Sequence, residues 1–381
     1  MRRDPVYGGL TGGLRQFRSK SMLPITERSG TMRGSMRREL RILIAALPVL
    51  LLVGDVAFWR FAEARLQTGF QTWLAQRRGA GWKTGFAPVA SGGWPLAATL
   101  TVPKLSLQGG DPDIPGGVGW SADRLVLRLD LWHPTELDIV VEGEQRLRFG
   151  ALPDIPCSAD RLEATMPLPA GDVPHEINLQ VRDLRAILPD DTGAGTTLTI
   201  GLLQAHVGLA TSTGPALAFT ISAEAIGLPQ AIHWALGPIL SSFTLDGTLN
   251  GKPPLGHGLT EAATAWRDGG GSLEIRHLTL GWGPLGLTAS ATMALDDQLQ
   301  PMGAGTGHIV GYAATLDSLA HDGVLSRSAV TAAKAVLSLL AGTPDDSGTS
   351  EVEVPLTLQY RTLSMRQVPL VRLPELDWPA Q

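Results

Sequence analysis

The stretch SLEIRHLTLGWGPLGLTASATMAL, residues 272–295, decides the fold of this chain. Apolar and polar residues alternate through 272–282 and again through 285–295, which is typical of β-strands with one buried face. Gly283 and Pro284 lie between the two runs and predict a turn. Two strands joined without an intervening helix predict an antiparallel pair.

The same alternation continues through most of the chain after Trp82. Because the chain has 45 glycines and 27 prolines, we expect frequent turns and few long helices. The small residues of 303–312 predict a strand that packs thinly. The fold class predicted is mainly β (β-rich α+β), with long antiparallel curved sheets, an N-terminal membrane-anchor and stalk helix, and two late helices. Further strands are expected at 97–108, 124–132, 137–143, 176–184, 197–210, 217–225, 243–251 and 352–365, and the late helices at 312–323 and 326–342.

An apolar run begins at Ile42 and is interrupted only by Asp55 before it ends at Trp59. Basic residues precede the run, and a positive flank before an apolar segment is the pattern of an export signal. We therefore predict a transmembrane signal anchor at 40–59, after a disordered basic cytoplasmic tail at 1–39. The predicted anchor residues are Ile42, Leu43, Leu47, Leu50, Leu51, Leu52, Phe58 and Trp59, and the predicted cytoplasmic flank is Arg33, Arg37, Arg38 and Arg41.

Three alternatives concern this segment. Ala62-Glu63-Ala64 is a small-x-small cleavage candidate, but it lies inside a helical pattern, so we expect the anchor to be retained. A run this short could instead be a buried core helix. Met32 and Met36 would each begin a compact signal, so we expect translation to start after Met1.

An amphipathic stalk helix is predicted at 60–81, because apolar residues recur there at steps of three and four. Gly79 and Gly81 are expected to end the helix. The rest of the chain, 82–381, is predicted to be an extracytoplasmic β-rich domain, with a weak boundary near 227–256. The stripe that should pack on this domain is Phe58, Ala62, Leu66, Phe70, Trp73 and Leu74.

Charge divides the chain in the same way. Residues 1–41 hold ten Lys or Arg and three acids, which is +7; the net charge is −5, so the remainder carries −12. An acidic body is a poor match for nucleic acid, whose phosphates require clustered cations.

Catalytic and metal-binding signatures are absent from the sequence. No metalloprotease, serine-hydrolase or nucleotide-loop motif occurs, and the eight histidines are scattered. Cys157 is the one cysteine, which excludes a disulfide and a Cys-pair zinc site. The acid pairs, such as Asp296–Asp297, are typical of turns. We therefore predict no catalytic, cofactor-binding or metal-binding residue and no cofactor.

Three segments resemble landmarks of an uncharacterised bacterial family, the one catalogued as domain of unknown function 2125. These are FWRFAEARLQTGFQTWLAQRRGAGW (58–82), SGGWPL (91–96) and LWHPTELDIVVEG (131–143). The resemblance implies a short membrane segment, a helix ending near Gly-Trp, a Gly-aromatic-Pro turn with Trp94 where Phe is expected, and long strands. It implies no catalytic residue, since the family's function is unassigned. The stretch LDDQLQPMGAGTGHIVGY (295–312) is also similar, at the level of the fold, to AsmA-like envelope proteins, whose β-rich bodies offer apolar grooves to lipids.

The function expected is that of an uncharacterised, single-pass inner-membrane envelope protein with its C-terminal domain in the bacterial periplasm. It is non-enzymatic, and it binds lipid-like hydrophobic ligands or acts structurally; its partners are the membrane lipid bilayer and a lipid-like ligand, and not nucleic acid. One alternative is a membrane-associated hydrolase with a dispersed active site, which predicts a histidine or Cys157 in a cleft near an acid. Another is a protein-interaction module that uses sheet edges.

Overall fold

The computed structural model describes residues 32–381 except 110–116, 151, 169–175, 191–192, 194, 211–215, 252–257, 341–350, 366–367, 377 and 379–381. Before Ala46 only the backbone is described. The chain divides into two compact units, Met1–Gly54 and Asp55–Gln381. Of the predicted disordered tail, residues 1–31 lie outside the described residues, whereas the backbone of 32–39 is helical. The arginine side chains at 33, 37, 38 and 41 and the side chains of Ile42 and Leu43 also lie outside the described residues.

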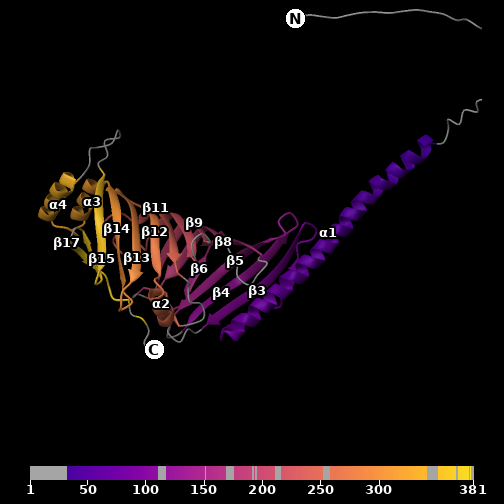
Figure 1. The fold of residues 1–381 in the computed structure, drawn as a ribbon, viewed down its shortest axis with the longest axis horizontal. Coiled ribbons are helices and arrows are strands. Elements are labelled where there is room, and N and C mark those ends of the chain that lie inside the picture. Colours follow the sequence, from indigo (N-terminus) through magenta and orange to yellow (C-terminus); the bar gives the residue numbers. More distant parts are fainter. Residues whose placement is uncertain are drawn as a thin grey trace, which may run out of the picture. The chain divides into compact units, whose positions relative to one another are not determined.

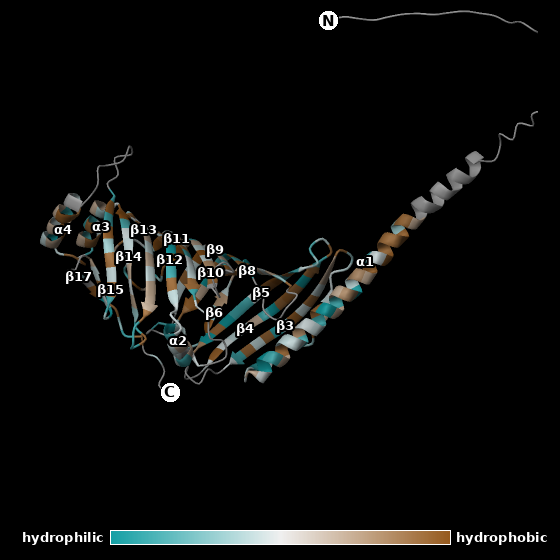
Figure 2. Cartoon of the chain, viewed as in Figure 1, coloured by the Kyte–Doolittle hydropathy of each residue, from teal (hydrophilic) through white to brown (hydrophobic). Residues whose placement is uncertain are grey.

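In the first unit, the described residues form the beginning of α1 (Met32–Gly79). Predicted anchor and predicted stalk are thus parts of one continuous helix, with Pro48 inside it. Apolar side chains from Leu47 to Val53 are exposed on all sides of this helix, and Figure 2 shows the hydrophobic stretch along it. A search of the described residues found no helix long and apolar enough to cross a membrane.

The second unit is built on one antiparallel sheet, to which seventeen strands in the described part of the chain belong (Figure 1). This confirms the predicted mainly β fold. The strands are β1 (Lys83–Gly85), β2 (Ala90–Gly92), β3 (Ala97–Gly109), β4 (Val118–Asp130), β5 (Glu136–Phe149), β6 (Ile155–Ser158), β7 (Arg161–Pro167), β8 (Glu176–Leu188), β9 (Thr196–Ala210), β10 (Ala216–Gly227), β11 (Ile239–Asn250), β12 (Ser272–Trp282), β13 (Leu285–Leu295), β14 (Pro301–Val310), β15 (Val352–Gln359), β16 (Thr362–Met365) and β17 (Val368–Arg372).

Most strands pair with their neighbours in the chain, as expected of a meander. The exceptions are short: β1 and β2 both pair with β3, and β6 and β7 both lie between β5 and β8. The region 227–256, where the sequence indicated a weak boundary, holds β11, which pairs with β10 on one side and β12 on the other. Strand direction turns steadily from β3 to β15, as sheet twist requires (Figure 1).

Strand register gives the sheet one continuous apolar face. Side chains alternate between the faces of a strand, so residues paired across neighbouring strands lie on the same face. One row of paired residues crosses twelve strands, from β3 to β15, and every member is apolar. The row is Val102, Leu125, Val141, Leu162, Val181, Leu203, Ala223, Phe243, Leu280, Leu287, Ile309 and Val352.

The second half of α1 covers the first part of this face. Ala62, Leu66, Phe70 and Leu74 are at most 5% exposed and share a core with β3, β4 and β5. This confirms the predicted stripe, and α1 ends at Gly79, two residues before the predicted end. The Trp59 indole N–H also donates to the Gly92 carbonyl oxygen at 3.0 Å. The segment is therefore part of the core rather than a separable stalk.

Helices α3 (Tyr312–His321) and α4 (Arg327–Leu340) lie near the other end of the sheet. Both predicted late helices are confirmed, and Lys334 of α4 bonds Asp317 of α3 at 2.6 Å. Val330 of α4 is buried, as are Val352 and Val354 of β15. A further helix, α2 (Leu259–Asp268), was not expected; its Trp266 indole donates to the Asn250 carbonyl oxygen at 2.8 Å.

Candidate functional site

Between its two ends, the apolar face of the sheet is only partly covered. In the row above, Val102, Leu125 and Val141 near α1 are buried, and so is Val352 near α4; between them only Val181 and the small Ala223 are buried as well. Leu203, Phe243, Leu280 and Leu287 instead keep part of their surface accessible. The neighbouring row of paired residues is also apolar and partly exposed. Its members include Leu179, Ile221, Leu245 and Leu278. An uncovered apolar surface therefore follows β7 to β13; we call it the central apolar face.

Small residues line the apolar side of β13, the last strand of the central apolar face, and of β14 beside it. Gly305 pairs with Ala291, and a Cβ added at Gly305 would lie 2.7 Å from the Ala291 Cβ and 2.4 Å from the Ser290 carbonyl oxygen. Gly307 pairs with Ala289, and a Cβ there would meet Leu287 and Leu356 at an ordinary 3.7 Å. The alternating small residues predicted at 303–312 thus leave room above the sheet.

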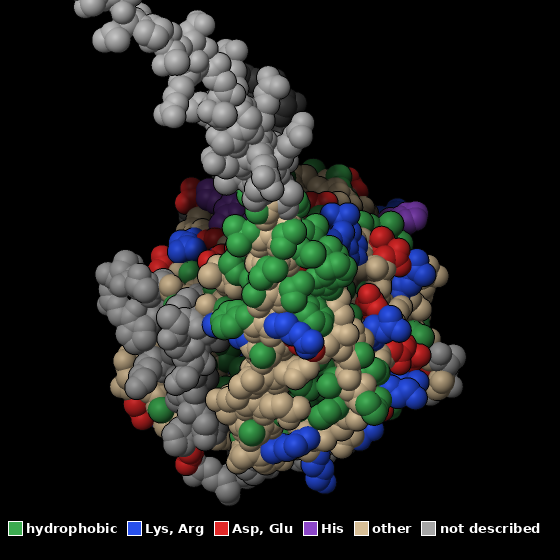
Figure 3. Space-filling model, turned by 90° about the vertical axis from the view of Figure 1, so that its right-hand side faces the viewer, with side chains coloured by type: hydrophobic (Ala, Val, Ile, Leu, Met, Phe, Trp, Pro, Cys, Tyr) green, Lys and Arg blue, Asp and Glu red, His purple; other side chains and the backbone are tan. Residues whose placement is uncertain are grey.

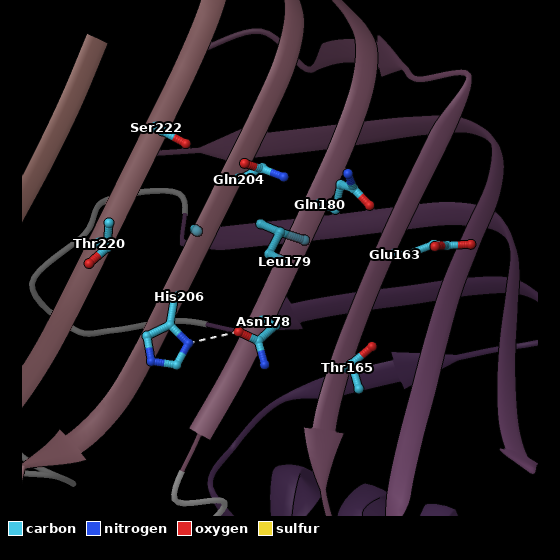
Figure 4. Close-up of a pocket in the computed structure, with 10 residues that line it drawn as sticks. Glu163, Thr165, Asn178, Leu179, Gln180, Gln204, His206, Thr220 and Ser222 are labelled. Carbon is cyan, nitrogen blue, oxygen red and sulfur yellow. Dashed lines mark hydrogen bonds between the residues drawn. The ribbon is translucent and has the colours of Figure 1, made fainter. Parts of the chain in front are cut away.

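The opposite face of β7 to β10 is polar and is hollowed over a volume of about 410 Å³ (Figure 4). Paired residues again explain it: Glu163, Gln180, Gln204 and Ser222 form one row across the four strands. The next row is Thr165, Asn178, His206 and Thr220, and it continues to Asp246 of β11.

Polar contacts hold this second row in place. His206 Nδ1 lies 2.7 Å from the Asn178 Oδ1, and the Thr220 hydroxyl donates to Asp246 at 2.9 Å. Arg276 Nε donates to the other Asp246 oxygen at 2.6 Å, which lowers the pKa of that carboxyl below its usual value. Cross-strand pairs of this kind stabilise a solvated sheet face.

Among the residues weighed as chemical candidates, His206 lines the polar hollow, with its Nδ1 3.5 Å from the Glu176 carboxylate, as the hydrolase alternative predicts of one histidine. The other described candidates lie apart from it. His233 pairs with Asp322, and His308 with Glu351, on different strands and turns, while His175 and His257 lie outside the described residues. No group of three His, Cys, Asp or Glu side chains suited to a metal was found among the described residues. Cys157 is buried, and that burial, with Glu144 nearby, raises the pKa of its thiol.

The predicted anchor residues that the structure describes fall into two groups. Leu47, Leu50, Leu51 and Leu52 are more than half exposed, with Leu50 at 69%. Phe58 and Trp59 are instead partly buried against the core of the second unit.

Comparison with known families identifies the chain's relatives. A family model described as an uncharacterized protein conserved in bacteria, DUF2125, matches residues 59–374. The chain belongs to this family. The DUF2125 match begins at Trp59, so it includes the part of α1 that packs on β3 to β5, together with the whole central apolar face. No curated protein and no solved structure matches the chain.

Sequence reasoning therefore found the apolar strand faces but not the site. Each alternating strand shows which residues share a face, and the central apolar face consists of those residues. What covers a face is decided by tertiary packing, for which the alternation carries no signal. The polar hollow was also missed, because Asn178, Gln180, Gln204 and His206 read singly as solvent-facing residues.

Proposed function

We propose that this DUF2125 protein is a non-enzymatic envelope protein that binds a lipid-like molecule along its central apolar face. One observation carries the proposal: the apolar rows continue across the sheet, but between α1 and the α3–α4 pair most of their large side chains, such as Leu203, Phe243 and Leu280, keep part of their surface accessible. A closed scaffold would bury them throughout. Contiguous exposed apolar surface on a soluble body marks an interaction site, and small-molecule sites are mostly apolar and concave.

The chemistry of the face limits the ligand to apolar chains. Leu203, Ile221, Leu245 and Leu278 offer no hydrogen-bond donor, acceptor or charge from their side chains. A polar group buried there without a partner would cost free energy. An extended acyl chain matches the composition of the face, while a headgroup would stay at its rim in water.

We further propose that residues 40–59 hold the protein at the bacterial inner membrane, with the second unit in the periplasm. The exposed leucines of α1 support this, since a helix that is apolar on all sides requires an apolar environment. The arginines upstream support the orientation, because cationic flanks remain cytoplasmic. Such a location would give the central apolar face access to membrane lipid.

The test places a photoreactive benzoylphenylalanine in the full-length chain in bacterial cells. Leu245 and Thr244 are adjacent in β11 and point to opposite faces of the sheet, so each controls for the other. We expect irradiation to give a lipid adduct, identified by mass spectrometry, at position 245 and not at 244.

Equal adducts at both positions, or none at 245, would contradict the proposal. Position 125 serves as a second control, because Leu125 lies on the same face but is buried in the core that contains α1. An adduct at 245 that is absent at 125 assigns the lipid to the uncovered part.

A further inference from the structure

Exposed tryptophans gather at one end of the strands that pack with α1. Trp94 lies in the turn between β2 and β3, and Trp132 follows β4; they are 53% and 74% exposed. The Leu131 N–H donates to the Leu96 carbonyl oxygen at 2.9 Å, which holds these two segments side by side. Leu96 is itself 54% exposed. Three large apolar side chains therefore project from neighbouring turns.

Helix α1 adds to the same end of the second unit. The Trp59 indole bonds the Gly92 carbonyl oxygen, just before the turn that carries Trp94. On the side of α1 away from the core, Phe61 is exposed, and the exposed Arg60 guanidinium lies 5.3 Å from the Trp59 ring. Figure 3 shows hydrophobic side chains gathered on this side of the molecule, with Lys and Arg side chains beside them.

From this arrangement we propose that Trp94, Leu96 and Trp132 form a membrane-docking surface that inserts into the headgroup region of a bilayer. The proposal rests on the membrane location proposed above. Tryptophan favours this region because its ring is apolar while its indole N–H remains hydrogen-bonded. Arg60 supplies a cation for lipid phosphates. Arg60 and Phe61 belong to α1, and the part of the same helix just before Asp55 is apolar. This apolar part favours a lipid bilayer over a protein as the partner of the surface.

The role of the surface would be to orient the body. A single helix fixes a protein to a membrane at one point and leaves its body free to tilt, whereas a second contact through Trp94 and Trp132 limits that motion. Docked in this way, the end of the sheet at which β3 begins and β4 ends faces the bilayer.

The experiment measures depth with a nitroxide label on the full-length chain in vesicles of equal parts phosphatidylethanolamine and phosphatidylglycerol. The label is attached at Trp132→Cys, with Leu96→Cys as a second site and Tyr360→Cys as the control; Tyr360 is 85% exposed and lies between β15 and β16. Cys157 is buried and stays unlabelled. We expect the labels at 132 and 96 to collide more with oxygen than with a water-soluble nickel complex, and the label at 360 to show the reverse.

Flotation of the vesicles separates the possible failures. Protein that floats with nickel-accessible labels at both 132 and 96 overturns the docking surface and leaves the anchor intact. Protein that does not float overturns both the docking surface and the anchor. Neither result changes the photocrosslinking test of the central apolar face.

Discussion

Replacing Leu74 with alanine tests whether α1 belongs to the folded body. Leu74 is 1% exposed and lies in the core shared with β3, β4 and β5. Removing a buried leucine side chain costs about 2–5 kcal/mol, because the apolar transfer energy is lost and a cavity remains. Both α1 and the sheet line the cavity that Leu74→Ala leaves, so the cavity has little room to collapse. We therefore expect a loss of about 3 kcal/mol in the free energy of unfolding.

That loss converts into a measurable shift in melting temperature. At about 2.1 cal/mol/K per residue, a domain of just over 300 residues unfolds with an entropy near 0.7 kcal/mol/K. A loss of about 3 kcal/mol then lowers Tm by about 4 °C. Circular dichroism at a β-sheet wavelength, on the full-length protein in mild detergent, would follow the transition.

Leu51→Ala is the matched control, since Leu51 is in the same helix and is 64% exposed. We expect its Tm to stay within about 1 °C of the wild type, because surface substitutions usually change stability by less than 0.5 kcal/mol. Equal shifts for Leu74→Ala and Leu51→Ala would show that α1 contributes no buried face to the folded body.

Three further predictions concern the second unit. Gly271→Ala places a Cβ 2.3 Å from the Trp266 ring and should lower the free energy of unfolding by about 1–3 kcal/mol. Gly69→Ala is the control, because a Cβ there has nothing within 4 Å and should not destabilise the protein. Denaturant midpoints compare the two variants, and equal midpoints would contradict the packing at Trp266. Arg276→Met should raise the pKa of Asp246, which the Arg276 hydrogen bond lowers. Because the folded pKa is the lower one, the stability that Asp246 contributes is complete above its ordinary pKa of about 3.9 and is lost as the pH falls through the folded value. Carboxyl carbon NMR titration checks this, and an unchanged midpoint in the variant would count against the pair. Cys157, buried and with its thiol pKa raised by burial, should react with iodoacetamide at pH 8 at least about tenfold more slowly in the folded protein than in urea; equal rates would show that the thiol is accessible.

Local pattern predicted most of the long strands, but the single strand expected at 352–365 is two paired strands, β15 and β16, with a turn at Tyr360 and Arg361. The stretch at 272–295 gives β12 and β13 at the expected residues, since alternation and the Gly283–Pro284 turn agree. Within β12, Arg276 and His277 stand together between Ile275 and Leu278, and the register shifts there. A bulge inserts one residue and keeps the apolar side chains on one face.

Other elements are harder to predict from the sequence pattern. Strands β6 and β7 are short, and Pro156 and Cys157 break the polar–apolar alternation at 155–158. Helix α2 is only ten residues long, although its apolar residues Leu259, Ala262 and Trp266 stand at helical spacing; Trp266 bonds Asn250, and Arg267 bonds the Asp297 carbonyl oxygen. The exposure of the central apolar face was not predictable either, because buried and exposed stretches of the same row, such as Val102 and Leu203, look alike in the sequence.

Native mass spectrometry of the full-length protein released from lipid nanodiscs tests whether an apolar ligand occupies the central apolar face. We predict a stoichiometric lipid adduct that persists after the surrounding lipid is stripped away. Leu245→Arg should abolish the adduct, because it places a charge on the apolar face, whereas Thr244→Arg on the polar face of the same strand should keep it. A protein without a retained lipid, or one in which both variants behave alike, would contradict the proposed binding.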